Sequence, residues 1–184
     1  IETGVEMDTN VEVTGLGGHL TATYPVLDGW SAQVHMGLLR EQVAMPLHHL
    51  GLLDSLAERV QLGLCSNFSH SETAHRVLAE AGLGDLMDAV LVSDAVGIRK
   101  PAPEIFQATL DALNVEAEEL LHVGDRLGAD VAGAAALGIR TAWIVRRVDD
   151  PAAALEAGSG PDPDLQVADL AELPGRVAGL GTGS

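Results

Sequence analysis

Polar side chains of complementary chemistry stand where apolar segments of the chain give way to loops. The set holds a hydroxyl, an amide, an ammonium group and two carboxylates: Ser66, Asn67, Lys100, Asp125 and Asp130. A hydroxyl and an ammonium group suit the oxygens of a phosphate, and paired carboxylates suit a hard cation such as Mg²⁺. Brought together by the fold, these residues would form a site for an anion and a metal ion.

The elements that must position these residues are of two alternating kinds. Short apolar runs predict strands at residues 61–65, 89–92, 120–123, 141–145 and 165–168. Helical periodicity and end signals predict helices at residues 52–59, 69–82, 103–113, 128–137, 150–157 and 170–180, the second opened by a capping box at residues 69–72. Apolar strands that alternate with helices are typical of a parallel sheet with helices on both faces. We therefore predict an α/β fold of three layers.

In such a sheet, ligands bind beyond the carboxyl ends of the strands, which is where the candidate residues fall. Each residue also has a structural explanation. Ser66 could cap a helix, Asp125 could belong to a turn, and Asp130 could favour a helix dipole from the first turn. Lys100 could be a solvated loop residue. Their convergence at one edge of the sheet favours a shared functional site.

Lys100 is the only lysine among ten basic residues, because the other nine are arginines. A compact ammonium group and a planar guanidinium are not interchangeable where one point charge must fit against an anion. We therefore expect Lys100 to contact an anionic group. As a loop residue beyond a strand end, it is expected to contribute little to the core.

The composition limits the classes of partner. Hydrophobic residues make up 47% of the 184 residues, so a sizeable core can form. The formal net charge of −17 argues against nucleic acid or an anionic membrane as a partner, but it leaves room for a small anionic substrate at a local positive site. The single cysteine, Cys65, cannot form an internal disulfide, and we expect it to be a buried small hydrophobe. This favours a reducing, cytoplasmic location.

The first 45 residues follow a less regular pattern. Residues 11–14 and 19–24 resemble short strands, whereas residues 29–45 place Trp30, Val34 and Leu38 on one helical stripe. We expect a small, partly helical region at residues 1–45, an α/β core at residues 46–180 and a frayed tail at residues 181–184. The chain begins at Ile1 rather than at Met, which is expected of a processed chain or a fragment.

Three segments of the core resemble ordered motifs of a known family. Residues 64–68 are Leu-Cys-Ser-Asn-Phe, residues 97–106 are Gly-Ile-Arg-Lys-Pro-Ala-Pro-Glu-Ile-Phe, and residues 122–130 are His-Val-Gly-Asp-Arg-Leu-Gly-Ala-Asp. They resemble motifs II, III and IV of the haloacid dehalogenase-like (HAD) hydrolases. The resemblance covers residues 45–175 and implies a three-layer Rossmann-like core, with residues 1–45 as part of a helical cap.

The resemblance also implies a role for each candidate residue. Ser66 would bind the transferring phosphoryl group, and Asn67 would lie at the edge of the substrate. Lys100 would neutralise the phosphoryl oxygens and the nucleophile. Asp125 would hold Mg²⁺, and Asp130 would complete or orient the metal site. These roles imply a phosphatase that acts on small phosphorylated metabolites through an aspartyl-phosphate.

The family's motif I is missing from the sequence. It should be an apolar strand that ends in Asp-x-Asp, precedes Ser66 and lies in the middle of the sheet. Residues 8–10, Asp-Thr-Asn, are the nearest match, but they lack an apolar strand before them and a second acid. We therefore expect the nucleophile to lie outside this chain, and the chain as given to be inactive.

Two other functions share this fold. A 2-haloacid dehalogenase needs no metal, so Asp125 and Asp130 argue against it. A non-catalytic phosphate-sensing or interaction protein would have lost its nucleophile. An in-frame Asp-x-Asp segment upstream of Ile1 would favour the enzyme, and a start codon at Ile1 would favour the non-catalytic protein.

Overall fold

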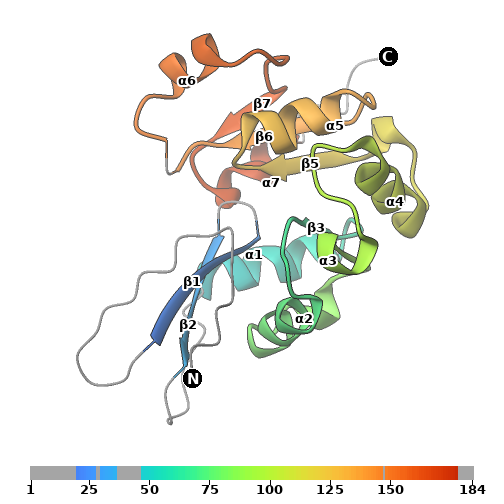
Figure 1. The fold of residues 1–184 in the computed structure, drawn as a ribbon, viewed down its shortest axis with the longest axis vertical. Coiled ribbons are helices and arrows are strands. Elements are labelled where there is room, and N and C mark those ends of the chain that lie inside the picture. Colours follow the sequence, from blue (N-terminus) through green and yellow to red (C-terminus); the bar gives the residue numbers. More distant parts are fainter. Residues whose placement is uncertain (1–19, 28–29, 37–46, 147, 178–184) are drawn as a thin grey trace.

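The computed structural model describes residues 20–27, 30–36, 47–146 and 148–177 (Figure 1). Its strands are β1 Leu20–Leu27, β2 Trp30–Met36, β3 Gly63–Ser66, β4 Ala89–Val92, β5 Leu121–Gly124, β6 Arg140–Ile144 and β7 Leu165–Val167. Its α-helices are α1 Leu47–Ala57, α2 Ser71–Glu80, α3 Ser93–Val96, α4 Pro103–Leu113, α5 Gly133–Ala135, α6 Pro151–Ala157 and α7 Leu173–Val177. Short turns of other helix types are η1 Gly84–Leu86, η2 Ala117–Glu119, η3 Leu127–Ala132 and η4 Leu170–Glu172.

The strands of the core are all parallel. β3 pairs with β4, and β5, β6 and β7 form a second ladder in that order. Figure 1 shows the β5–β7 ladder in the upper half of the molecule and β3 with α2 in the lower half. Each strand lies within two residues of its predicted bounds, and the predicted α/β fold is confirmed. Within the described residues, β3 and β5 do not share a ladder.

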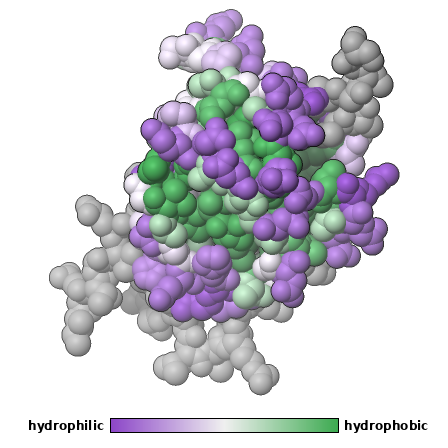
Figure 2. All heavy atoms as spheres, turned by 90° about the vertical axis from the view of Figure 1, so that its right-hand side faces the viewer, coloured by the Kyte–Doolittle hydropathy of each residue, from purple (hydrophilic) through white to green (hydrophobic). Residues whose placement is uncertain are grey.

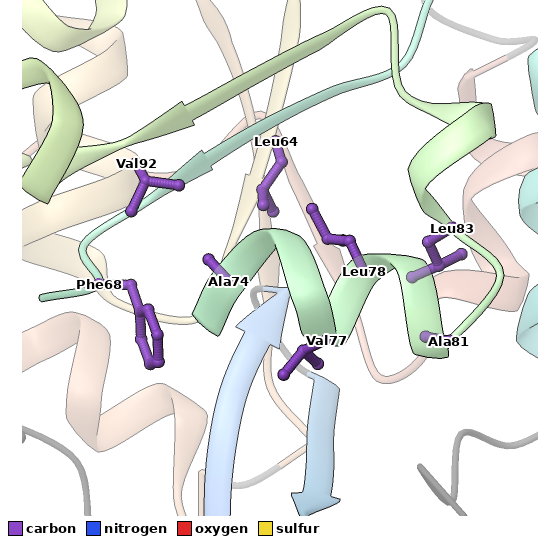
Figure 3. Packing of buried hydrophobic residues seen from close by; sticks show 8 residues of the cluster. All are labelled: Leu64, Phe68, Ala74, Val77, Leu78, Ala81, Leu83 and Val92. Atoms are coloured by element: carbon purple, nitrogen blue, oxygen red, sulfur yellow. The ribbon is translucent and has the colours of Figure 1, made fainter. Parts of the chain in front are cut away.

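Helices cover both faces of the β3–β4 pair because neighbouring residues of a strand point to opposite faces. Leu64 of β3 packs in one cluster with Val77 and Leu78 of α2 (Figure 3). Its neighbour Cys65 belongs to a different cluster, with Ile105 and Phe106 of α4 and with Ala134 of α5. The predicted burial of Cys65 is confirmed, since only 7% of it is exposed. This alternation fixes which side of β3 each helix occupies.

A third cluster buries part of the β5–β7 ladder. Ala142 and Ile144 of β6, Val167 of β7 and Leu173 of α7 form one cluster. Figure 2 looks at the side on which α4 lies in Figure 1, and hydrophobic residues fill the centre of this face with hydrophilic ones around them. Val60 is the exposed large hydrophobic residue of the described part. No helix in that part is both long and apolar enough to span a membrane.

The prediction of a helix at residues 29–45 is wrong for residues 30–36, which form β2. β1 and β2 make an antiparallel hairpin in which Leu20 is opposite Met36 and Tyr24 is opposite Ala32. Residues four apart lie on one face of a strand as well as of a helix, so the spacing of Trp30 and Val34 fits both. Pairing with β1, which covers the predicted strand at residues 19–24, decides between them. The predicted strand at residues 11–14 and the Asp8–Asn10 segment lie outside the described residues.

Three helices also differ from the prediction, and the first of them, α1, begins at Leu47 rather than at residue 52. The N-cap of α2 is His70, not Ser69, because the Nδ1 atom of His70 accepts a hydrogen bond from the backbone N–H of Thr73 at 3.3 Å. The predicted helix at 128–137 is instead a π-type turn, η3, followed by the short α5. In η3, the carbonyl of Arg126 accepts from the N–H groups of both Asp130 and Val131. π-type turns are frequent at functional sites.

Candidate functional site

Lys100 lies at the centre of the candidate site and is buried. Only 5% of the residue is exposed, so the prediction's alternative of a solvated loop lysine is wrong. Its Nζ atom donates to the carbonyl oxygen of Cys65 at 2.7 Å and lies 2.8 Å from Oδ1 of Asp130. A compact ammonium group on a long stem can reach both acceptors, one in β3 and the other in the η3 turn that follows β5.

The carbonyl of Cys65 is available to Lys100 because of its place in β3. Leu62, three residues earlier, turns its carbonyl toward the β4 side, where it accepts from the N–H of Asp88 at 2.7 Å. Backbone groups of successive residues in a parallel strand point to alternate sides, so the Cys65 carbonyl points away from β4. A buried carbonyl at a strand edge needs a donor, and the ammonium group of Lys100 supplies it.

Asn67 holds the backbone of Lys100. Its Oδ1 atom accepts from the Lys100 N–H at 2.7 Å, and its Nδ2 atom donates to the Lys100 carbonyl at 2.9 Å. Both polar atoms of the amide are therefore engaged with the loop that carries the lysine. This geometry links the end of β3 directly to residue 100.

Asp130 is 1% exposed and uses both carboxylate oxygens. Oδ1 faces the ammonium group of Lys100 at 2.8 Å, and Oδ2 accepts from the N–H of Arg126 at 2.9 Å. Burial works to raise the pKa of Asp130, but a hydrogen bond from His122 and the charge of Lys100 outweigh it and hold the pKa well below its usual range. Asp130 is therefore a charged partner of Lys100.

Gly124 gives Asp130 the space it needs. A Cβ atom at position 124 would lie 2.4 Å from both Cβ and Cγ of Asp130, a distance that real structures do not allow. The η3 turn brings the carboxylate back over the end of β5, five residues after Asp125. Because the backbone of Gly124 approaches the carboxylate so closely, only glycine fits there without displacing the buried ion pair.

Ser66 and Asp125 stand at the carboxyl ends of β3 and β5, and both are partly exposed. Within the described part of the chain, the Ser66 hydroxyl and the Asp125 carboxylate make no hydrogen bond or ion pair. The backbone of Asp125 is fixed, since its carbonyl accepts from Nε1 of Trp143 at 2.9 Å. These two side chains are open to a ligand, unlike Asn67 and Asp130.

The open carboxylate of Asp125 has the oxygen chemistry that Mg²⁺ prefers. Asp130 has no comparable freedom, because both of its oxygens already accept protein donors. No group of three or more His, Cys, Asp or Glu side chains in the described residues could hold a metal ion by itself. Asp125 therefore offers one carboxylate, whereas Mg²⁺ takes several oxygen ligands.

Sequence reasoning missed His122, which belongs to this cluster. It is a buried residue of β5, and its Nε2 atom lies 3.5 Å from Oδ1 of Asp130. The signal was present in the sequence: a polar ring in an apolar run, two residues before Gly124. A buried polar group needs a partner, so a histidine in a buried strand indicates a polar contact within the core.

The fold is that of an α/β protein with parallel strands. At the carboxyl ends of these strands, it has a buried lysine paired with an aspartate and a second, partly exposed carboxylate. A family model described as haloacid dehalogenase-like hydrolase matches residues 43–138, which is more than half of the 184 residues. The chain belongs to this family of hydrolases. The match includes Ser66, Lys100, Asp125 and Asp130.

Relatives of known activity include two phosphatases. The chain is 42% identical over 98 residues to the phosphoserine phosphatase of Thermus thermophilus, an alignment that covers 52% of this chain and 36% of that protein. It is 46% identical over 62 residues to the glyceraldehyde 3-phosphate phosphatase of Pyrococcus abyssi, covering 34% of this chain and 26% of that protein. The chain thus spans about a third or less of the length of these relatives.

Solved structures share the fold. A HAD phosphatase from Thermococcus onnurineus has a TM-score of 0.60 and 32% identity, with 71% of this chain and 56% of that chain covered. A 2-haloacid dehalogenase from Pseudomonas syringae has a TM-score of 0.62 and 26% identity, with 76% of this chain and 56% of that chain covered. The same fold therefore carries both activities that the sequence motifs left open.

Proposed function

We propose that this chain is part of a Mg²⁺-dependent phosphatase of small phosphorylated metabolites. The observation that carries the proposal is the buried ammonium group of Lys100, held 2.8 Å from Asp130 at the edge where Ser66 and Asp125 are open. A fixed positive charge beside open hydroxyl and carboxylate groups suits a phosphoryl group and its metal ion. Phosphoryl transfer depends mainly on such electrostatic positioning.

Each residue has a distinct task in this proposal. The Ser66 hydroxyl hydrogen-bonds a phosphoryl oxygen, and Lys100 neutralises the developing charge. Asp125 holds Mg²⁺, which supplies charge neutralisation of the phosphoryl oxygens when bound. Asp130 and Asn67 act through Lys100, the first on its ammonium group and the second on its backbone. The division follows from which polar atoms are already engaged and which are open.

The nucleophile in this proposal is an aspartate on a motif I strand that lies between β3 and β5. Two observations support this position. The Cys65 carbonyl points away from β4, and β3 and β5 share no ladder within the described residues. An aspartate at the end of such a strand would face Lys100. Its carboxylate would attack phosphorus and form an aspartyl-phosphate as the ester P–O bond breaks and the alcohol leaves, and water would then release inorganic phosphate and restore the carboxylate.

The open carboxylate of Asp125 favours the phosphatase over the 2-haloacid dehalogenase activity of the neighbour from Pseudomonas syringae. A metal-independent dehalogenase needs no metal ligand at this position. A non-catalytic phosphate-binding protein would use the same Ser66 and Lys100 but would need no Asp125. The role of Asp125 therefore separates the three functions.

The test compares the 184-residue chain with an extended protein, the same chain carrying the family's motif I strand ahead of Ile1. We expect hydrolysis of an aryl phosphate only in the extended protein, only with Mg²⁺, and without activity on 2-chloropropionate. Asp125→Asn should abolish hydrolysis, whereas Asp85→Asn, at an exposed position on η1, should leave it unchanged. Mg²⁺-independent dechlorination, or full activity of Asp125→Asn, would refute the proposal.

A further inference from the structure

His122 is a buried side chain to which the proposed function assigns no task. It lies in β5, three residues before Asp125, and only 8% of it is exposed. Its Nε2 atom is 3.5 Å from Oδ1 of Asp130. A carboxylate can only accept, so the imidazole must carry its hydrogen on Nε2 to make this contact.

The same oxygen of Asp130 faces two donors. Oδ1 is 2.8 Å from the ammonium group of Lys100 and 3.5 Å from the imidazole of His122, while Oδ2 accepts from the backbone N–H of Arg126. The carboxylate is thus held from its far side by the η3 backbone and from beneath by β5. With both restraints in place, the orientation of the carboxylate is fixed, and Oδ1 faces the ammonium group of Lys100.

Phe106 of α4 fixes the plane of the imidazole ring. The two ring centres are 5.2 Å apart and the planes are inclined by 84°, an edge-to-face arrangement. This geometry is favourable between rings and resists rotation of either one. Phe106 is 1% exposed and packs with Ile105, so the ring that holds His122 is itself held by the core.

We propose that His122 is a positioning residue: through Asp130, it fixes the place and the hydrogen bonding of the Lys100 ammonium group. The chain of contacts runs from Phe106 in α4 through His122 and Asp130 to Lys100. The link to phosphate rests on the proposed function, but the positioning itself does not. Packing alone would need a ring at position 122, whereas positioning needs a donor at the place of Nε2.

The single lysine makes this proposal measurable in the 184-residue chain. Labelling with ¹⁵N-lysine gives one side-chain ammonium signal, and it belongs to Lys100. Two close acceptors should slow the exchange of its hydrogens with water enough for the signal to be seen. In His122→Phe, which keeps a ring and removes the donor, we expect exchange at least about tenfold faster, as the loss of a hydrogen bond to a charged group implies.

His122→Gln provides the rescue, because its Nε2 amide can take the place of the imidazole Nε2. We expect it to return exchange to within about threefold of the parent, since the lost donor is restored. The matched control is His75→Phe at an exposed position on α2, which should leave the signal unchanged. An unchanged signal in His122→Phe, or equal acceleration in the Phe and Gln variants, would overturn the proposal.

Two further measurements complete the test. If His122→Phe fails to fold, the imidazole ¹⁵N chemical shifts of the parent protein test the proposal instead. Shifts that show no hydrogen on Nε2 would overturn it, and shifts that show a hydrogen there would support it. Inorganic phosphate added with Mg²⁺ to the extended protein should shift the Lys100 signal. If it does not, while the variants behave as expected, the proposed function fails and the positioning role of His122 stands.

Discussion

The side chain of Asn67 hydrogen-bonds both backbone groups of Lys100, at 2.7 Å to its N–H and at 2.9 Å to its carbonyl. An amide is suited to this task because it carries an acceptor and a donor side by side. The clamp ties the end of β3 to a loop 33 residues later in the chain. Lys100 is thereby restrained at its backbone by Asn67 and at its ammonium group by Asp130.

Asn67→Ala should therefore lower the free energy of unfolding by about 1–3 kcal/mol, because it leaves two partly buried backbone groups without partners. Asn67→Asp keeps the acceptor and loses the donor, so it should fall between the alanine variant and the parent. Gln107→Ala is the matched control, since it removes an amide whose bond to Asp111 lies on an exposed helix surface. Urea denaturation checks the order; equal losses for Asn67→Ala and Gln107→Ala would contradict the clamp.

Lys100 was expected to contribute little to the core, and its burial reverses that expectation. Lys100→Met leaves the carboxylate of Asp130 buried without its charged partner, which should cost about 3–5 kcal/mol. Lys100→Arg should also destabilise, because a planar guanidinium cannot occupy the place of one ammonium between two acceptors. Thermal and urea unfolding measure both effects.

The double variant Lys100→Met with Asp130→Asn serves as the control for this pair. It removes both charges, so its loss of unfolding free energy should be smaller than the summed losses of the two single variants. We expect a coupling energy of roughly 1–3 kcal/mol. Strict additivity of the two changes would mean that the 2.8 Å contact carries no net interaction energy.

Glycine at position 124 should be irreplaceable, unlike glycine at position 128. Gly124→Ala places a methyl group 2.4 Å from the side chain of Asp130 and should destabilise by about 2 kcal/mol or more through overpacking. Gly128→Ala meets nothing within 4 Å and needs no positive φ, so it should be neutral or slightly stabilising. A soluble Gly124→Ala protein with the parent's melting temperature would contradict the close approach.

Asp94 should contribute to the acid sensitivity of the fold. Its Oδ2 atom accepts from the hydroxyl of Ser71 at 2.6 Å and from the Ser71 N–H at 2.9 Å, and these bonds lower the pKa of Asp94. A lowered pKa in the folded state gives stability that is present above the ordinary value and is lost as the pH falls. Asp94→Asn should therefore reduce the melting temperature most near about pH 7 and least near about pH 3.

Asp85→Asn controls for the removal of one negative charge from a strongly acidic surface. It lies on η1 and is exposed, and it should change the melting temperature by a similar small amount at both pH values. A constant difference between Asp94→Asn and the parent across the range would show that the Ser71 bonds do not respond to charge.

The strands of the core were predictable because each contains a short run of mainly apolar residues, and β3 shows the reason most clearly because both of its faces are buried. Leu64 and Cys65 face different helices, so no polar residue interrupts β3 until Ser66. Ser66, Asn67 and Asp125 could be selected as candidates for a related reason, because they lie at the carboxyl ends of β3 and β5. The apolar composition of a strand and the position of a residue at its end can both be read from a short stretch of sequence.

The strand that pairs with a given strand, and the atom that a polar side chain contacts, were not predictable in the same way. Trp30 and Val34 fit a helix and a strand equally, and only pairing with β1 makes them part of β2. The engagement of Asn67 with a backbone 33 residues away, and of His122 with Asp130, depends on how the loops meet in space. Sequence pattern gives a polar residue's place along a strand but not the atom that it contacts.

The bond from Trp143 to the carbonyl of Asp125 gives the site an intrinsic optical probe. Trp143 is 1% exposed, and its indole N–H donates to the peptide oxygen of Asp125 at 2.9 Å. Indole emission responds to hydrogen bonding at that nitrogen, and Trp30 is the only other indole in the sequence. In a Trp30→Phe background, fluorescence would therefore follow the movement of the Asp125 peptide in real time as ligands arrive, without any label.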